Sequence, residues 1–522
     1  MSKRILIYAL LLLPSYIVHQ SFLHAETPAT VRIDKTITIF NDVMRELDMN
    51  YVDTLNYEDL TESAINHLLR KIDPYTVYYP KEKDPELKMM TTGKYGGIGS
   101  IISRRDSLTY VNTPYENMPA QRNDVQAGDR ILSVDGISTE GKTVSEVSNL
   151  LRGVPGTKVR LVLEREGLKE PIVREFEREE IHLPAVAYST VLSSKVGYLA
   201  FSEFTTGSSQ EFAAALEDLV YNQGAKALIV DLRGNGGGLV DEAIKIVNLF
   251  VGPNIEIVTT KGKIEASNRS YKTTMSARYP ELPLRILVDK NSASASEIVA
   301  GSLQDLKRAT LIGQRTYGKG LVQNLRPIAY DGHLKVTTSK YYLPSGRCIQ
   351  AIDYAERQKG KALKRDTAGG ILPDIVIEDS AKVDITYALY SKHMFFDYAT
   401  RYKHTHDTIA ADFQLAEADI EDFCAFLEER KFTYETETAK MLKDVLEMAR
   451  NEDIDSSMLA QLSDIETQLS TINYREAINR NLDEVKEFLG ADIVERYSFQ
   501  KGRAAYLLRF DKELKRAIES LE

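Results

Sequence analysis

Two apolar runs that each end in a corner of small residues constrain the fold of this chain most. Residues 227–232 (Ala-Leu-Ile-Val-Asp-Leu) lead into Arg-Gly-Asn-Gly-Gly-Gly at 233–238, and residues 284–289 lead into a serine-rich stretch at 290–296. Short continuous apolar runs bounded by turn residues are typical of buried strands. A helical pattern follows each corner. The alternation predicts an α/β unit, in which active sites concentrate at strand-to-helix corners.

The 522 residues are enough for three or four domains. We expect the α/β unit to span 171–380. A unit of strands, glycines and one helix precedes it at 91–170. Helical spacing of apolar residues predicts an N-terminal helical region at 26–90 and a C-terminal helical domain at 381–522.

The first 25 residues have the pattern of an export signal. A basic Ser-Lys-Arg at 2–4 precedes an apolar run from Ile5 to Leu13, and Ala25 offers a small residue for cleavage. The run is shorter than the ~20 residues that span a bilayer. We therefore expect residues 1–25 to be a signal peptide of a periplasmic or cell-envelope protein, with an uncleaved membrane anchor as the alternative.

Charge and cysteine content exclude several classes of protein. Lys and Arg total 66 against 76 Asp and Glu, so the net charge is 66 − 76 = −10. This balance argues against a nucleic-acid partner, which requires a basic face. The two cysteines, Cys348 and Cys424, cannot build a disulfide framework or a four-thiolate zinc site. We expect no metal and no cofactor.

Residues 91–170 carry two glycine motifs. The first is Gly96-Gly97-Ile98-Gly99, and the second is Ala-Gly-Asp-Arg-Ile-Leu-Ser-Val-Asp-Gly at 127–136. Successive glycines let backbone N–H groups converge on a peptide's terminal carboxylate, and an adjoining strand edge can then accept the peptide. A tight turn is the alternative for the first motif alone. Together the motifs resemble a PDZ domain, with Gly96–Gly99 as its carboxylate-binding loop.

The serine-rich corner at 290–296 offers a nucleophile. Small residues there can leave a hydroxyl exposed, with N–H groups of the following helix directed at the same point. A serine that only caps the helix, ahead of Glu297, is the alternative. Ser292, Ser294 and Ser296 need not share one role.

A serine nucleophile needs a base. No histidine lies in a glycine-rich corner of the α/β unit, whereas Lys319 lies between Gly318 and Gly320. A lysine can accept a proton if burial lowers its pKa. Gln323, four residues further on, could hold the amine in place. A lysine in a surface turn is the alternative.

These segments resemble the signature of the carboxy-terminal processing peptidases, which are serine endopeptidases with a Ser/Lys pair and an embedded PDZ domain. The matching motifs are Ser-Ala-Ser-Ala-Ser-Glu at 292–297, Tyr-Gly-Lys-Gly at 317–320 and Val-Gln at 322–323. The resemblance covers about residues 33–380. It implies Ser294 as nucleophile, Lys319 as base (319 − 294 = 25 residues on) and Gln323 as the residue that orients the base.

The same resemblance implies an oxyanion hole made by the N–H groups of Ala295 and Gly237, with a slip to Gly236 or Gly238 left open. It also implies an α+β multidomain fold: a helical N-terminal region, a β-barrel-like PDZ domain, a peptidase core related to the crotonase/ClpP-like fold, and a helical C-terminal domain.

The function implied is cleavage of protein substrates near an exposed C-terminus, with the PDZ domain holding that terminus and gating the site by moving. An adaptor, or self-association through residues 381–522, is left open. An inactive PDZ scaffold and an acyl-CoA hydratase-like enzyme are the competing classes. The intact serine, lysine and glycine motifs argue against the first, and the PDZ-like insertion and export signal argue against the second.

Overall fold

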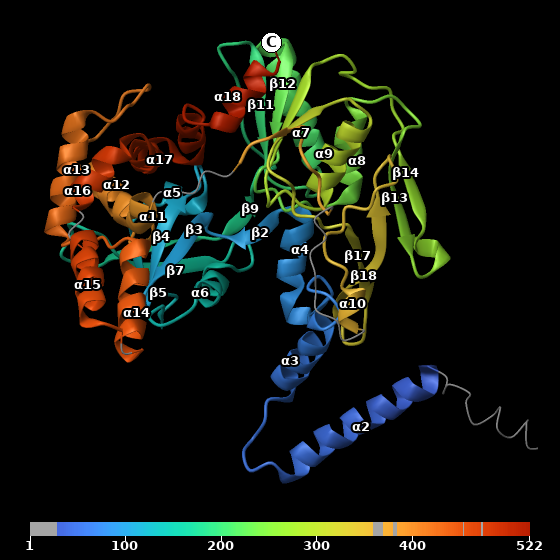
Figure 1. Cartoon of the computed structure of the whole chain (residues 1–522). Coiled ribbons are helices and arrows are strands. Elements are labelled where there is room, and N and C mark those ends of the chain that lie inside the picture. The colour runs from blue at the N-terminus through green and yellow to red at the C-terminus, as the bar shows by residue number, and fades with distance from the viewer. Residues whose placement is uncertain (1–28, 359–368, 379–383, 453, 471–472, 522) are drawn as a thin grey trace, which may run out of the picture. The chain divides into compact units, whose positions relative to one another are not determined.

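The computed structural model describes residues 29–358, 369–378, 384–452, 454–470 and 473–521 (Figure 1). The predicted signal peptide therefore lies outside the described residues. The chain divides between Leu68 and Leu69 into two compact units. The first contains α2 (Ala29–Asn50) and most of α3 (Tyr57–Arg70). The second unit, Leu69–Glu522, contains all of the described strands and the candidate site.

Within the second unit, strands between residues 100 and 177 form a small antiparallel sheet with the strand order β3-β4-β5-β7-β8. The strands are β3 (Ser100–Arg105), β4 (Leu108–Pro114), β5 (Arg130–Val134), β7 (Lys158–Glu164) and β8 (Ile172–Glu177), and β6 (Ile137–Ser138) pairs with β5. The helix α6 (Val144–Leu151) is the helix expected from the sequence in this unit. Its start is fixed by reciprocal hydrogen bonds between Thr143 and Glu146. The sheet reaches beyond residue 170, because β8 pairs with β7 along its whole length.

The α/β core is a six-stranded sheet in the order β10-β11-β12-β15-β16-β19. Its strands are β10 (Val186–Val191), β11 (Val196–Phe201), β12 (Ala227–Asp231), β15 (Leu284–Val288), β16 (Thr310–Gly313) and β19 (Ile375–Val376). All pairs are parallel except β10 with β11. The helices α7 (Ser208–Glu217), α8 (Val240–Asn248) and α9 (Ala295–Asp305) share one buried apolar cluster with the sheet. The two apolar runs of the sequence are the neighbouring strands β12 and β15, as predicted.

A second sheet is formed by strands that come between those of the core sheet in the sequence, together with one earlier strand. It has the order β1-β18-β13-β14, and β17 also pairs with β18. Its strands are β1 (Val77–Tyr79), β13 (Glu256–Gly262), β14 (Arg269–Lys272), β17 (Leu321–Pro327) and β18 (His333–Tyr342). The region 26–90 was predicted to be helical, yet it contributes β1, in which Val77 is paired with Lys335. A strand of three residues carries too little periodicity to be seen in the sequence.

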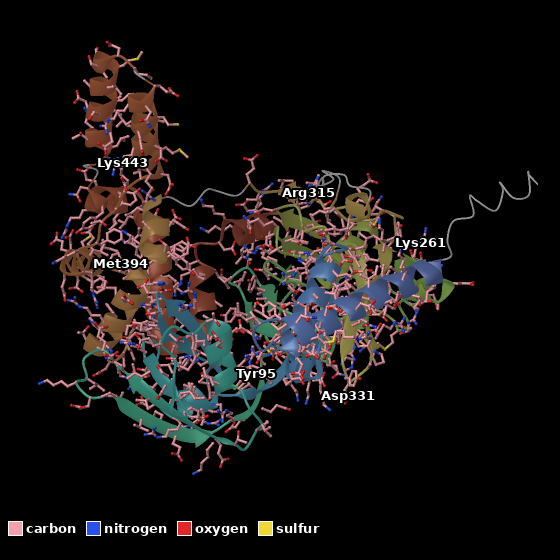
Figure 2. All side chains as sticks on the ribbon, turned by 90° about the horizontal axis from the view of Figure 1, so that it is seen from below. Tyr95, Lys261, Arg315, Asp331, Met394 and Lys443 are labelled. Carbon is pink, nitrogen blue, oxygen red and sulfur yellow. The ribbon has the colours of Figure 1, made fainter. Side chains whose placement is uncertain are left out.

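The C-terminal part is helical, as the sequence predicts. Its helices are α11 (Asp384–Ser391), α12 (Met394–Thr405), α13 (Glu417–Glu429), α14 (Glu437–Asn451), α15 (Ser456–Ser470), α16 (Tyr474–Arg480), α17 (Leu482–Leu507) and α18 (Lys512–Glu519). Figure 2 shows Met394 and Lys443 on the helices of this part. Met394 opens α12, and Lys443 of α14 forms an ion pair with Glu435. None of the described helices combines the length and apolarity needed to cross a bilayer.

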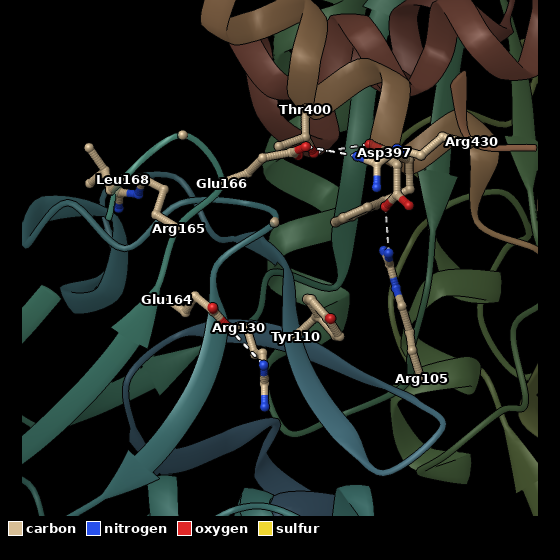
Figure 3. A pocket seen from close by; sticks show the side chains of 13 residues that line it. Arg105, Tyr110, Arg130, Glu164, Arg165, Glu166, Leu168, Asp397, Thr400 and Arg430 are labelled. Carbon is tan, nitrogen blue, oxygen red and sulfur yellow. Dashed lines mark hydrogen bonds and ion pairs between the residues drawn. The ribbon is translucent and has the colours of Figure 1, made fainter. Parts of the chain in front are cut away.

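Both ends of this helical part contact the rest of the second unit. Arg105 of β3 forms an ion pair with Asp397 of α12, in a pocket that Arg430 also lines (Figure 3). At the other end, α18 packs Leu514 and Ala517 against the α/β sheet. The helical domain is thus attached both to the small antiparallel sheet and to the α/β core.

Candidate active site

Ser294 lies at the corner between β15 and α9 in a strained conformation. Its φ is 57° and its ψ is −112°, a backbone conformation that residues other than glycine rarely adopt. Such a conformation costs on the order of 1–3 kcal/mol and persists where the surrounding structure enforces it. Ala295 is the first residue of α9, so its N–H has no acceptor within the helix. The hydroxyl and this N–H therefore belong to the same corner.

The structure separates the three serines that the sequence left equivalent. Ser292 and Ser296 are fully buried. The Ser292 hydroxyl donates to the carbonyl of Leu232 (2.8 Å), and the Ser296 hydroxyl donates to that of Asn235 (2.9 Å). These two serines therefore fasten the serine corner to the glycine loop at 233–238. Ser294, which is only partly buried, is the one left available for chemistry.

Gly237 brings the glycine loop against this corner. It has a φ of 98°, and a Cβ atom there would lie 2.8 Å from the backbone nitrogen of Ala295 and 2.6 Å from the carbonyl oxygen of Ala293. Only glycine fits so close. Its own N–H donates to the Asn235 side-chain oxygen (2.9 Å). The loop is where the sequence predicts an oxyanion hole, but this N–H already has an acceptor, and the donor role of Gly237 stays a prediction.

A matched pair of substitutions tests the loop. Gly237→Ala should lower kcat by about 100-fold, comparable to the loss of one oxyanion donor, because the new methyl group pushes against the serine corner. Gly236→Ala should have little effect, since a Cβ there meets nothing within 4 Å. Peptidase assays on both variants check this. Equal activity of the two variants would contradict the assigned role of the Gly237 contact.

Glu297 joins the serine corner to the lysine loop at 316–320. Its carboxylate is fully buried and accepts hydrogen bonds from four donors. These are the N–H groups of Ser294 (2.9 Å), Gly318 (2.8 Å) and Lys319 (2.9 Å) and the hydroxyl of Thr316 (2.5 Å). Burial raises the pKa of Glu297, and the donors, which favour the carboxylate, act in the opposite direction. The sequence indicated Glu297 only as part of a helix cap.

Tyr341 of β18 makes a second connection between the same two segments. Its buried hydroxyl lies 2.6 Å from the carbonyl oxygen of Lys319 and 3.1 Å from that of Ser294. Together with Glu297, it fixes the backbone of the predicted nucleophile relative to the backbone of the predicted base. Nothing in the local sequence around Tyr341 indicates this contact.

The amine of Lys319 is in an environment suited to a base. Burial, followed by the positive charge of Lys335, lowers the pKa of Lys319 from 10.5 to about 8, although the charges of Glu297 and Asp73 oppose the change. Half of the amine is therefore neutral near pH 8. Lys319 Nζ lies 4.6 Å from the centroid of the Tyr75 ring. A lysine in an exposed surface turn would not have these properties.

Gln323 lies at a bulge in β17, and its side-chain amide donates to the hydroxyl of Thr337 (3.2 Å). Within the described residues, no hydrogen bond joins Gln323 to Lys319 or Ser294 Oγ to Lys319 Nζ. Thr337 in turn contacts Thr76, which follows Tyr75. The three predicted catalytic residues are therefore linked by a chain of contacts through the residues around them. The orienting role of Gln323 stays a prediction.

Part of the predicted carboxylate-binding loop is a strand. Gly96 and Gly97 belong to β2 (Lys94–Gly97), which pairs with β9 (Glu179–His182). A Cβ on Gly96 would lie 2.0 Å from the Gly153 carbonyl oxygen, so the close packing there requires glycine. The turn itself contains the buried Ile98 and Gly99, whose φ is 70°. The following strand, β3, is at the edge of its sheet and contacts α6, so one side of it is unpaired within that sheet.

Comparison with known proteins agrees with this architecture. The family described as "Peptidase family S41" matches residues 195–377, a PDZ domain matches 110–165, and "Probable PDZ-protease, C-terminal helical domain" matches 385–521. The carboxy-terminal-processing protease of Bartonella bacilliformis is 35% identical over 347 residues, which are 66% of this chain and 75% of that protein.

A protein of Staphylococcus aureus with the name "Probable CtpA-like serine protease" is 33% identical over 331 residues, 62% of this chain and 63% of that protein. Among solved structures, the photosystem II D1 C-terminal processing protease is 25% identical and has a TM-score of 0.38, over 65% of this chain and 86% of that one.

A PDZ domain joined to an S41 peptidase core defines a serine peptidase that carries its own peptide-binding domain. The chain belongs to peptidase family S41, among the carboxy-terminal-processing proteases. The predicted family and the predicted multidomain α+β fold are thereby confirmed.

Proposed function

We propose that Ser294 is the nucleophile and Lys319 the general base of this serine peptidase, and that it cleaves protein substrates near the C-terminus through an acyl-enzyme. The observation that carries the proposal is the buried carboxylate of Glu297, which accepts the N–H groups of both Ser294 and Lys319. One side chain thus holds the two reacting segments together.

The chemistry follows from the protonation state of Lys319. The neutral amine takes the proton from Ser294 Oγ as this oxygen attacks the scissile carbonyl carbon. The Ala295 N–H and an N–H of the glycine loop stabilise the oxyanion, each lowering the barrier by about 3 kcal/mol. The Lys319 ammonium then protonates the leaving amine, and water hydrolyses the acyl-enzyme with Lys319 again as base. Gln323 is proposed to orient the amine once substrate is bound.

Substrate selection is assigned to the PDZ domain. The unpaired edge of β3 supports addition of an extended peptide as a further strand. The turn around Ile98 and Gly99 would hold the peptide's terminal carboxylate, with Gly96 and Gly97 shaping the approach. We propose that movement of this domain gates the site, as the resemblance to the carboxy-terminal processing peptidases implies.

Paired substrates test this assignment. An unfolded protein with a free apolar C-terminus should be cleaved at least about tenfold faster than the same protein with an amidated C-terminus, because the amide lacks the carboxylate that the PDZ loop binds. Equal rates would remove the PDZ domain from substrate selection. Cleavage that persists in Ser294→Ala would contradict the assigned nucleophile.

The proposed location is the periplasm or cell envelope. It is supported by the basic, apolar and small-residue order of residues 1–25. The mass of the protein from its native host distinguishes the two forms: loss of about 25 residues indicates a cleaved signal, and retention indicates an anchor.

A further inference from the structure

We infer that Tyr75 is a positioning residue for the base, because its ring covers the Lys319 amine and shields it from water. The inference rests on the proposed role of Lys319. Tyr75 belongs to the segment before β1, outside the α/β core that carries Ser294 and Lys319. Tyr75 lies outside the sequence motifs that match the peptidase family.

The contact is between a ring face and an ammonium group. Lys319 Nζ lies 4.6 Å from the centroid of the Tyr75 ring, within the range of a cation–π contact. Such a ring has two opposite effects on the stability of the charged amine. Its π face attracts the charged amine, while its bulk takes the place of water that would solvate the charge. Burial is the largest influence on the pKa of Lys319 and lowers it, and we assign part of this burial to the Tyr75 ring.

A turn built by Asp73 holds Tyr75 in this position. One oxygen of the buried Asp73 carboxylate accepts the N–H groups of Tyr75 (2.8 Å) and Thr76 (2.7 Å), and the other accepts the Thr76 hydroxyl (3.0 Å). Immediately after this turn, β1 begins and pairs Val77 with Lys335 of β18. The ring is therefore anchored from the turn and from the sheet.

Two further tyrosines support the ring from the side. Tyr354 meets it edge-on, with ring centroids 6.0 Å apart and an interplanar angle of 88°. The hydroxyl of Tyr317, two residues before Lys319, lies 3.5 Å from the Tyr75 hydroxyl. Burial raises the pKa of the Tyr75 hydroxyl far above its ordinary value, so the ring stays neutral while Lys319 titrates.

The charged groups around Lys319 come from three other elements. Lys335 on β18 lowers the pKa of the amine, whereas Glu297 on α9 and Asp73 in the turn raise it. The Tyr341 hydroxyl contacts the Lys319 carbonyl rather than its amine and remains protonated. Removing the Tyr75 ring leaves these charges in place and admits water, so the pKa of Lys319 should move back toward its ordinary value.

The test uses the full-length protein with Tyr75→Ala and Tyr75→Phe, and measures kcat and kcat/KM from pH 6 to pH 10.5 on a short peptide substrate. Tyr75→Ala should move the midpoint of the kcat/KM profile, which reports the free enzyme, up by about one pH unit. Its activity at pH 7.5 should fall roughly tenfold and recover to within about threefold of wild type at pH 10. Tyr75→Phe keeps the ring and should keep the wild-type midpoint.

Tyr330→Ala is the matched control, because Tyr330 is 95% exposed and should leave the profile unchanged. A thermal melt confirms that each variant is folded at the temperature of the assay. An unchanged midpoint in folded Tyr75→Ala would overturn the inference. Equal defects in Tyr75→Phe and Tyr75→Ala would overturn it too, because the hydroxyl and not the ring would then matter. If Ser294→Ala or Lys319→Ala kept full activity, the proposed function would fail instead.

Discussion

Lys319→Ala is expected to lower kcat by about four orders of magnitude, because no other group at the serine corner is assigned to take the proton of Ser294. Lys319→Arg is the sharper control. A guanidinium keeps the positive charge but does not release its proton at the pH of the assay, so this variant should be as inactive as the alanine variant. Substantial activity in Lys319→Arg would mean that charge, and not proton transfer, is what the site needs.

The same base fixes the pH dependence of the wild type. Lys319 must be neutral to act, and its pKa of about 8 means that the charged form predominates below that pH. Activity should therefore rise with pH, reach half its maximum near pH 8 and level off above it. A profile of kcat/KM against pH, measured on a short peptide, reports the free enzyme and checks this. A rate that falls between pH 6 and pH 9 would contradict the assignment.

Glu297→Ala should have the second-largest effect, on activity and stability together. It leaves the buried N–H groups of Ser294, Gly318 and Lys319 without their acceptor. Unsatisfied buried donors cost about 1–3 kcal/mol each, so the unfolding free energy should fall by about 3 kcal/mol or more. We expect kcat to fall by at least about 100-fold, because the two reacting segments lose their shared anchor.

Glu297→Gln separates the two effects. Glutamine has the same shape and keeps one acceptor oxygen, so its unfolding free energy and kcat should lie between those of wild type and Glu297→Ala. Urea unfolding and peptide hydrolysis on the same preparations give both numbers. Wild-type kcat in Glu297→Ala would show that the shared carboxylate does not position the site.

The parts of the site that could be predicted are those encoded within short stretches of chain. β12 and β15 appear as continuous apolar runs, and the corners that follow them contain the glycines and serines that sharp turns require. The serine corner and the lysine loop could be located because their motifs are local, whereas the choice of Ser294 as nucleophile came only from the family resemblance. The difference between Ser292, Ser294 and Ser296 could not, since it depends on the carbonyls of Leu232 and Asn235, some sixty residues away.

The contacts that could not be predicted join distant segments. Tyr75 reaches Lys319 because β1 pairs with β18, and neither strand carries a signal for its partner. The three backbone N–H groups on Glu297 come from both of the segments it joins, so only its role in the helix cap could be recognised. The helices from α11 to α18 could be expected from the spacing of apolar residues, but the ion pairs of Arg233 with Asp511 and Glu513 could not.

Labelling with a fluorophosphonate, which bonds covalently to activated serine hydroxyls, tests the pairing of Ser294 with Lys319, and peptide mass mapping locates the adduct. We predict one adduct, on Ser294, whose rate of formation rises with pH through about 8. It should be absent in Ser294→Ala and slow in Lys319→Ala. An adduct on Ser292 or Ser296, or equal labelling of Ser294→Ala and wild type, would contradict the account.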